Sequence, residues 1–216
     1  MTRVRLLVLA ALLSAVPATG SAIDPSPAQV DALTVVDAPP SRAVVDLAFS
    51  SAPGPTPGLD ALLVLAGDPT QDLGLQIRAL RALPQYCLPA GCAGTAAHDA
   101  LARTVAGYRA QLAAAALSPQ DMLRLRAAME ALGATRSGLQ ADVDLLTAPA
   151  LLRHPSRDVQ VTAVHALRNL CSPDLCSHDA CMQDANAVRA LRTGADTQVD
   201  AAINLALADL APCAQP

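Results

Sequence analysis

Lysine and tryptophan are absent from this 216-residue chain, and aromatic side chains are almost absent. Phe49, Tyr86 and Tyr108 are the only aromatic residues, and all 15 basic residues are arginine. We attribute the missing lysine to codon or lineage bias rather than to function. A β-sandwich core normally uses aromatic and β-branched residues, whereas this chain is dominated by alanine and leucine. Those two residues favour helices, so we expect an all-α protein.

Motifs of catalysis are also lacking. The sequence contains no glycine-rich phosphate loop, no nucleophile elbow and no HExxH pair. Its four histidines, His98, His154, His165 and His178, are scattered and complete no Ser/His/Asp pattern. We interpret His98-Asp99 as a solvated pair in the first turn of a helix. We therefore expect a protein without enzymatic activity and without a cofactor.

Residues 1–22 have the form of a cleaved export signal. Arg3 and Arg5 precede an apolar run from Leu6 to Val16, which is too short to cross a bilayer. Cleavage is expected after Ala18, Gly20 or Ala22. Removing this segment changes the net charge from −4 to −6, which disfavours nucleic acid or an anionic membrane as the partner. We expect a periplasmic or extracellular protein with no membrane span.

Residues 23–57 differ in composition from the rest of the chain. They are rich in proline, which interrupts long helices. The stretch "RAVVDLAFS" (42–50) has the β-branched residues of a short strand, and we expect it to be extended and to lie against the first helices. The segment is interpreted as a linker or N-terminal extension ahead of a helical domain at 58–213.

From residue 58 onward the apolar periodicity is helical. We expect helices at 58–66, 71–86, 95–116, 119–134, 138–152, 157–170, 179–193 and 196–211. The stretches "LQIRALRAL", "LRLRAAMEALG", "VQVTAVHALRNL" and "VDAAINLALADL" are similar to one another and begin at residues 75, 123, 159 and 199. A unit of roughly 40 residues built from two helices indicates an α-solenoid.

The stretch "LLRHPSRDVQVTAVHALRNL" (151–170) resembles the HEAT-repeat family. It has a first helix ending in leucines, a turn with proline and aspartate, and then Val-x-x-x-Ala-x-x-x-Leu. The resemblance covers 58–211 as about four degenerate units, although Gln76 and Gln160 stand where HEAT units often carry arginine. It implies a solenoid whose second helices line a concave face. It also implies a function in binding other proteins.

By that resemblance, the polar positions of the second helices are the expected binding residues. They are Gln76, Arg78, Arg81, Arg124, Arg126, Gln160, His165 and Arg168. An arginine-rich stripe on an acidic chain suits acidic peptide segments. We expect a monomer that binds a protein partner and does not bind nucleic acid. The alternative is that these are ordinary solvated side chains.

The even number of cysteines in an exported chain predicts three disulfides. "CLPAGC" (87–92) and "CSPDLC" (171–176) follow two of the second helices at the same point of the repeat, which predicts the bonds Cys87–Cys92 and Cys171–Cys176. The remaining pair, Cys181–Cys213, would join the two ends of the last helix pair.

A metal site is the competing interpretation of the C-terminal cysteines. Cys171, Cys176, His178 and Cys181 would supply a Cys₃His set, although zinc ligands are usually separated by two to four residues. We expect no metal. The alternative function is a metal- or small-ligand-binding envelope protein that uses this cluster.

Overall fold

A computed structural model describes residues 23–34, 38–87, 92, 94–171, 177–192 and 194–212. Its helices are α1 (Pro27–Leu33), α2 (Arg42–Ala48), α3 (Pro57–Gly67), α4 (Leu73–Ala82), α5 (Ala96–Ala114), α6 (Pro119–Ala134), α7 (Gln140–Leu146), α8 (Pro149–Leu152), α9 (Arg157–Leu170), α10 (His178–Arg189) and α11 (Thr197–Leu210), with a 3-10 turn, η1 (Leu83–Tyr86), after α4. These ranges contain no strand. The expected all-α class is confirmed. The proposed signal peptide at 1–22 lies outside the described residues.

Side chains at the expected positions begin several of the helices. The Ser118 hydroxyl accepts a hydrogen bond from the Asp121 N–H at 3.1 Å, with Pro119 in the first helical position of α6. Asp72 accepts from the Leu75 N–H at 3.2 Å and so caps α4. Such caps satisfy N–H groups that have no partner inside the helix. Because capping residues can be recognised in the sequence, the starts of these helices were predicted well.

Two of the expected helices are interrupted, and proline lies at both interruptions. The helix expected at 138–152 is two helices, α7 and α8, because Pro149 starts a new helix after Thr147 and Ala148. The helix expected at 71–86 changes to a 3-10 turn after Ala82, where Pro84 follows. Proline has no N–H for the helical ladder and suits the first turn of a helix instead.

The proline-rich segment contains helices that belong to the core. The expectation of extended structure at 42–50 is wrong, because α2 occupies Arg42–Ala48. Ser41 caps α2, and Val45 and Phe49, four residues apart, are fully buried. The Tyr86 hydroxyl donates a hydrogen bond to Asp46 at 2.7 Å and so joins α2 to η1. Packing and a cap outweigh the weak strand propensity of the two valines.

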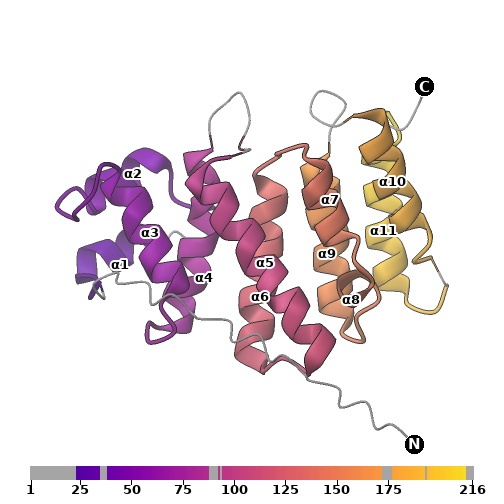
Figure 1. Ribbon diagram of the computed structural model, residues 1–216, viewed down its shortest axis with the longest axis horizontal. Helices are drawn as coiled ribbons and strands as arrows, with labels where there is room; N and C mark the ends of the chain where they lie inside the picture. Colours follow the sequence, from indigo (N-terminus) through magenta and orange to yellow (C-terminus); the bar gives the residue numbers. More distant parts are fainter. Residues whose placement is uncertain are drawn as a thin grey trace, which may run out of the picture.

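The helices from α3 onward form two layers along the long axis of the molecule (Figure 1). The B layer consists of α4, α6, α9 and α11, in which each helix contacts the next. The A layer consists of α3, α5, α7, α8 and α10, which pack onto the B layer through the contacts α3–α4, α5–α6, α7–α9, α8–α9 and α10–α11. Helices α1 and α2 cover the N-terminal end, where α1 contacts α4 and α2 contacts α3.

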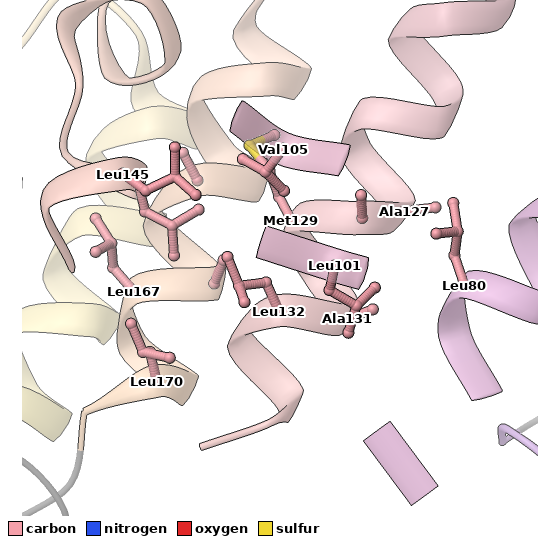
Figure 2. Packing of buried hydrophobic residues seen from close by; sticks show 14 of the residues in the cluster. Leu80, Leu101, Val105, Ala127, Met129, Ala131, Leu132, Leu145, Leu167 and Leu170 are labelled. Atoms are coloured by element: carbon pink, nitrogen blue, oxygen red, sulfur yellow. The ribbon is translucent and has the colours of Figure 1, made fainter. Parts of the chain in front are cut away.

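Small residues allow the B-layer helices to approach closely. A Cβ added to Gly133 of α6 would lie 2.6 Å from the carbonyl oxygen of Ala166 and 2.7 Å from its Cα. Around this contact, Leu132 and Leu167 are fully buried (Figure 2). Leucine and alanine are the most frequent residues of the buried core, as the composition suggests. None of the helices in the described ranges has the length and hydropathy that a bilayer span requires.

Candidate functional site

The residues predicted to bind a partner all lie on the B layer. Gln76, Arg78 and Arg81 are on α4, Arg124 and Arg126 on α6, and Gln160, His165 and Arg168 on α9. Because α4, α6 and α9 are successive neighbours, the structure distributes these side chains over adjacent helices.

Most arginines of this set form bridges between neighbouring B-layer helices. Arg81 of α4 donates to Glu130 Oε2 of α6 from Nη2 at 2.7 Å and from Nε at 3.1 Å. Arg126 of α6 pairs with Asp158 of α9 at 3.1 Å. Arg168 of α9 pairs with Asp209 of α11. Each consecutive pair of B-layer helices is thus joined by an arginine and a carboxylate.

Arg124 holds a more buried set of contacts between α4 and α6. Its Nε donates to Gln76 Oε1 at 2.5 Å, and its Nη1 donates to Asp121 at 2.8 Å. Gln76 is 1% exposed and also donates to the Gln71 carbonyl at 2.7 Å. The hydrogen bond from the Ser118 hydroxyl keeps the pKa of Asp121 below its ordinary value, and Arg124 adds to this effect. These polar groups are satisfied within the protein.

Arg78 is different from the bridging arginines. No carboxylate in the described part of the chain lies within ion-pair distance of it, although it is on the same helix as Arg81. Gln160 and His165, the remaining predicted residues, are half-buried on α9.

Arg78 lines a groove of about 560 Å³ on the surface. Its described lining residues come from the end of α1, from residues 38–40, from α4 and from the C-terminal half of α6. Its walls are Leu33, Thr34, Ala38, Pro39, Pro40, Arg78, Arg81, Glu130, Ala131 and Ala134. The volume falls within the range of ordinary ligand sites, and so does the mixture of apolar walls with a few charged groups. The sequence indicated Arg78 and Arg81, but the apolar wall from α1 was not expected.

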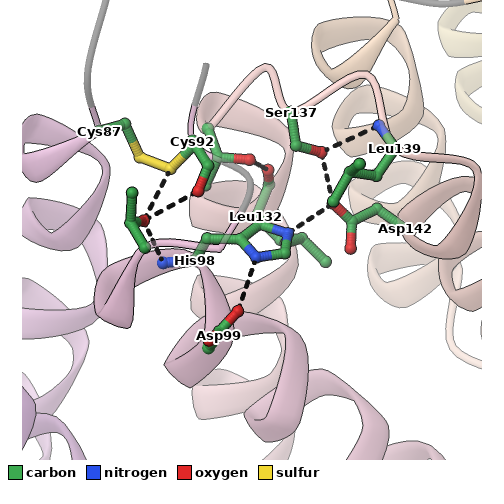
Figure 3. A network of polar contacts seen from close by, with 10 residues as sticks. Cys87, Cys92, His98, Asp99, Leu132, Ser137, Leu139 and Asp142 are labelled. Atoms are coloured by element: carbon green, nitrogen blue, oxygen red, sulfur yellow. Dashed lines mark hydrogen bonds and ion pairs between the residues drawn. A yellow bond between two sulfur atoms is a disulfide. The ribbon is translucent and has the colours of Figure 1, made fainter. Parts of the chain in front are cut away.

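A second polar cluster joins the start of α5 to α7 (Figure 3). His98 is 6% exposed and Asp142 is 2% exposed, and His98 Nε2 lies 2.8 Å from Asp142 Oδ2. His98 Nδ1 lies 3.2 Å from Asp99 Oδ1. The interpretation of His98-Asp99 as a solvated pair is therefore wrong for the histidine. No local signal could have revealed it, since Asp142 is 44 residues away.

The electrostatics of this cluster favour a charged histidine. Burial opposes the charge, but hydrogen bonds and charge interactions with Asp142 and Asp99 outweigh it and raise the pKa of His98 above its ordinary value. The Ser137 hydroxyl donates to Asp142 rather than to His98. A serine nucleophile needs a histidine that accepts its proton, and here carboxylates occupy both ring nitrogens. The arrangement supports a structural ion pair.

The first predicted disulfide lies beside this cluster. Cys87 and Cys92 are bonded, with Cα atoms 4.5 Å apart, which confirms the expected pairing. The Thr95 hydroxyl donates to the Cys92 carbonyl at 2.9 Å and accepts from the His98 N–H at 3.2 Å. Thr95, the N-cap residue of α5, therefore contacts a cysteine of the disulfide.

The other cysteines are described only in part. Cys176, Cys213 and the side chain of His178 lie outside the described residues, so Cys171–Cys176 and Cys181–Cys213 remain predictions. Neither Cys171 nor Cys181 carries a free thiol. Within the described ranges, no group of three side chains is placed to hold a metal ion.

Asp184 of α10 is buried without a polar partner among the described residues. Its side chain is 0% exposed, and neither carboxylate oxygen receives a hydrogen bond from that part of the chain. Burial alone raises the pKa of this carboxyl group to about 7. Nothing in the sequence distinguishes the buried Asp184 from Asp179, which lies in the same helix and is exposed.

Comparison with known proteins leaves the chain unassigned: no protein family model, no curated protein and no solved structure matches it.

Proposed function

We propose that this chain is an exported α-solenoid of HEAT-like helix pairs, stapled by disulfides. The order of the helices supports this architecture. Helices α3–α4, α5–α6, α7/α8–α9 and α10–α11 contact one another as pairs, and the second helix of each pair contacts the second helix of the next. The similar sequences at 75, 123, 159 and 199 begin within those second helices. Repeats that contact only their neighbours define a solenoid.

The function we propose is a non-enzymatic scaffold for protein–protein interaction. The observation that carries it is the groove of about 560 Å³ on the B layer. It combines apolar walls with Arg78, which has no carboxylate partner among the described side chains. Exposed apolar surface rimmed by polar groups is typical of interaction sites, and a charge on such a surface helps to select the partner.

Photocrosslinking in the native source tests this function. A photoreactive amino acid is placed at Ala134, which lines the groove on the B layer, or at Ala110 on the A layer; both side chains are exposed. We expect a discrete crosslinked species from residue 134 and none from residue 110. Equal crosslinking from both layers, or none from either, would contradict the proposal.

The alternative of a metal-binding protein depends on free thiolates at the C-terminal cysteines. The absence of a free thiol at Cys171 and Cys181 weighs against it. Elemental analysis of protein purified without chelators distinguishes the two functions, because stoichiometric zinc would favour the alternative.

A further inference from the structure

One of the bridges between B-layer helices, Arg126–Asp158, lies at a position of the repeat register that Arg78 also occupies. Arg126 stands three residues after the start of its unit, and it pairs with Asp158, one residue before the start of the next unit. Arg78 also stands three residues after the start of its unit. The position that corresponds to Asp158 in the following unit is Met122. The guanidinium of Arg78 has therefore been left without the carboxylate that the register would supply.

Arg78 lines the groove over α4, and the carboxylate of Asp72 is nearby but outside ion-pair distance of its guanidinium. The exposed apolar residues of the lining are Ala38 and Pro39, from the segment after α1, and Ala134 of α6. A carboxylate that enters between them would find Arg78, while its apolar neighbours would contact these walls. Arginine recognises carboxylates well because its planar fork can donate two parallel hydrogen bonds.

We propose that the groove binds a peptide segment of a partner protein in which a single carboxylate is flanked by apolar residues, with Arg78 as the group that receives the carboxylate. This inference depends on the proposed function, because it names the chemistry of the partner. It assigns the charge recognition to one residue rather than to the whole arginine stripe.

The other charged groups of the groove limit the ligand to one negative charge. Arg81 is already engaged by Glu130, with both hydrogen bonds ending on Oε2. Glu130 is itself negative, so it disfavours a second carboxylate beside the first. A run of acidic residues is therefore a poorer ligand than a single one.

Glu130 also favours a peptide over a fatty acid. Both hydrogen bonds from Arg81 end on Oε2 of Glu130, so Oε1 of Glu130 can still accept a hydrogen bond. The Glu130 side chain is 37% exposed. A peptide segment brings main-chain N–H groups that need acceptors when water is displaced. A fatty acid has no such donor and would leave this acceptor without a partner.

A peptide array measures the preference directly. The array holds acetylated and amidated six-residue peptides with one glutamate among leucine, isoleucine, valine and alanine, each beside its glutamine counterpart. The tightest binder is then titrated calorimetrically against the full-length mature protein. We expect glutamine in place of glutamate to weaken binding about tenfold to a hundredfold.

The same titration with variant proteins assigns the charge contact. Arg78→Ala should lower the affinity for the glutamate peptide about tenfold or more. The variant protein should then bind the glutamate and glutamine peptides with equal affinity. Arg153→Ala removes an exposed arginine outside the groove and should leave both affinities unchanged. Ala134→Trp should lower the affinity for both peptides, because the indole side chain would fill the groove. Arg78 holds no ion pair within the described part of the chain, so Arg78→Ala should keep the thermal midpoint of the parent.

Three outcomes would overturn the inference. They are an array in which no glutamate peptide exceeds its glutamine counterpart, an Arg78→Ala protein that still prefers glutamate, and tighter binding of a tetraglutamate peptide or of decanoate. If crosslinks still form on the B layer in any of these cases, only the assigned ligand is wrong. If the crosslinks are also absent, the proposed function fails as well.

Discussion

Gly133 of α6 lies so close to Ala166 of α9 that a Cβ on the glycine would meet the alanine backbone at 2.6–3.0 Å. Backbone atoms cannot move aside as the end of a side chain can, so α6 and α9 would have to separate. The contact between these helices is the centre of the B layer, where Leu132 and Leu167 are buried. The stacking of the helix pairs therefore depends on a residue without a side chain.

Gly133→Ala should destabilise the protein by about 1–3 kcal/mol, the usual cost of overpacking a core. Urea unfolding followed by circular dichroism measures this change. Gly107→Ala is the matched control, because a Cβ at Gly107 in α5 meets nothing within 4 Å. It should be neutral or stabilise by up to about 1 kcal/mol through helix propensity. Equal effects of the two substitutions would contradict the close contact.

The sequence predicts those parts of the architecture that depend on local patterns, and it does not predict those that depend on contacts between residues distant in the chain. The helices from α3 onward were predicted because apolar periodicity and caps such as Ser118 are local. Helix α2 was not predicted, because its stability comes from burying Val45 and Phe49 rather than from propensity. The bridge from Arg126 to Asp158 could have been inferred from the repeat register, since both residues lie near the starts of their units.

The His98–Asp142 contact should make stability depend on pH. The pKa of His98 is raised in the folded state, so its contribution is fully present below the unfolded value of about 6.5. The contribution is lost as the pH rises through the folded pKa. We expect the free-energy difference between the parent and His98→Gln to be larger at pH 5.5 than at pH 9. A difference that does not change with pH would show that folding leaves the pKa of His98 unchanged, and a smaller difference at pH 5.5 than at pH 9 would show that folded His98 is neutral.

Asp184 should have the opposite charge preference, because burial disfavours its ionised form. Its folded pKa of about 7 exceeds the unfolded value of 3.8. The folded state therefore binds the proton more tightly, and stability falls as the pH rises from about 4 to about 7. Asp184→Asn should consequently be more stable than the parent at pH 8, by about 1–3 kcal/mol, with the gain disappearing near pH 4.

Asp24→Asn is the control for this experiment, since Asp24 is exposed. It should not change the pH dependence. Loss of stability in Asp184→Asn at pH 8 would mean that the buried carboxylate is stabilised by a partner and would contradict its description as unpaired.

Disulfide mapping tests the repeat register at the C-terminus. Digestion without reduction should release linked peptides for Cys87–Cys92, Cys171–Cys176 and Cys181–Cys213. The intact oxidised protein should be lighter than the reduced protein by about six hydrogens. A Cys171–Cys181 link, or free thiols at these positions, would contradict the pairing. Replacing both Cys87 and Cys92 by serine should cost about 2 kcal/mol on the chain-entropy model.

We propose that the arginines of the B layer have separate functions: Arg124 joins α4 to α6 through Gln76, and Arg78 binds the partner. The most direct measurement compares the unfolding free energy and the affinity for the tightest array peptide in Arg124→Ala and Arg78→Ala. Arg124→Ala leaves the buried Gln76 oxygen without its donor, so stability should fall by about 1–3 kcal/mol with little change in affinity. Arg78→Ala should lower the affinity about tenfold or more and leave stability unchanged. Two variants that alter stability and affinity in the same way would contradict the account.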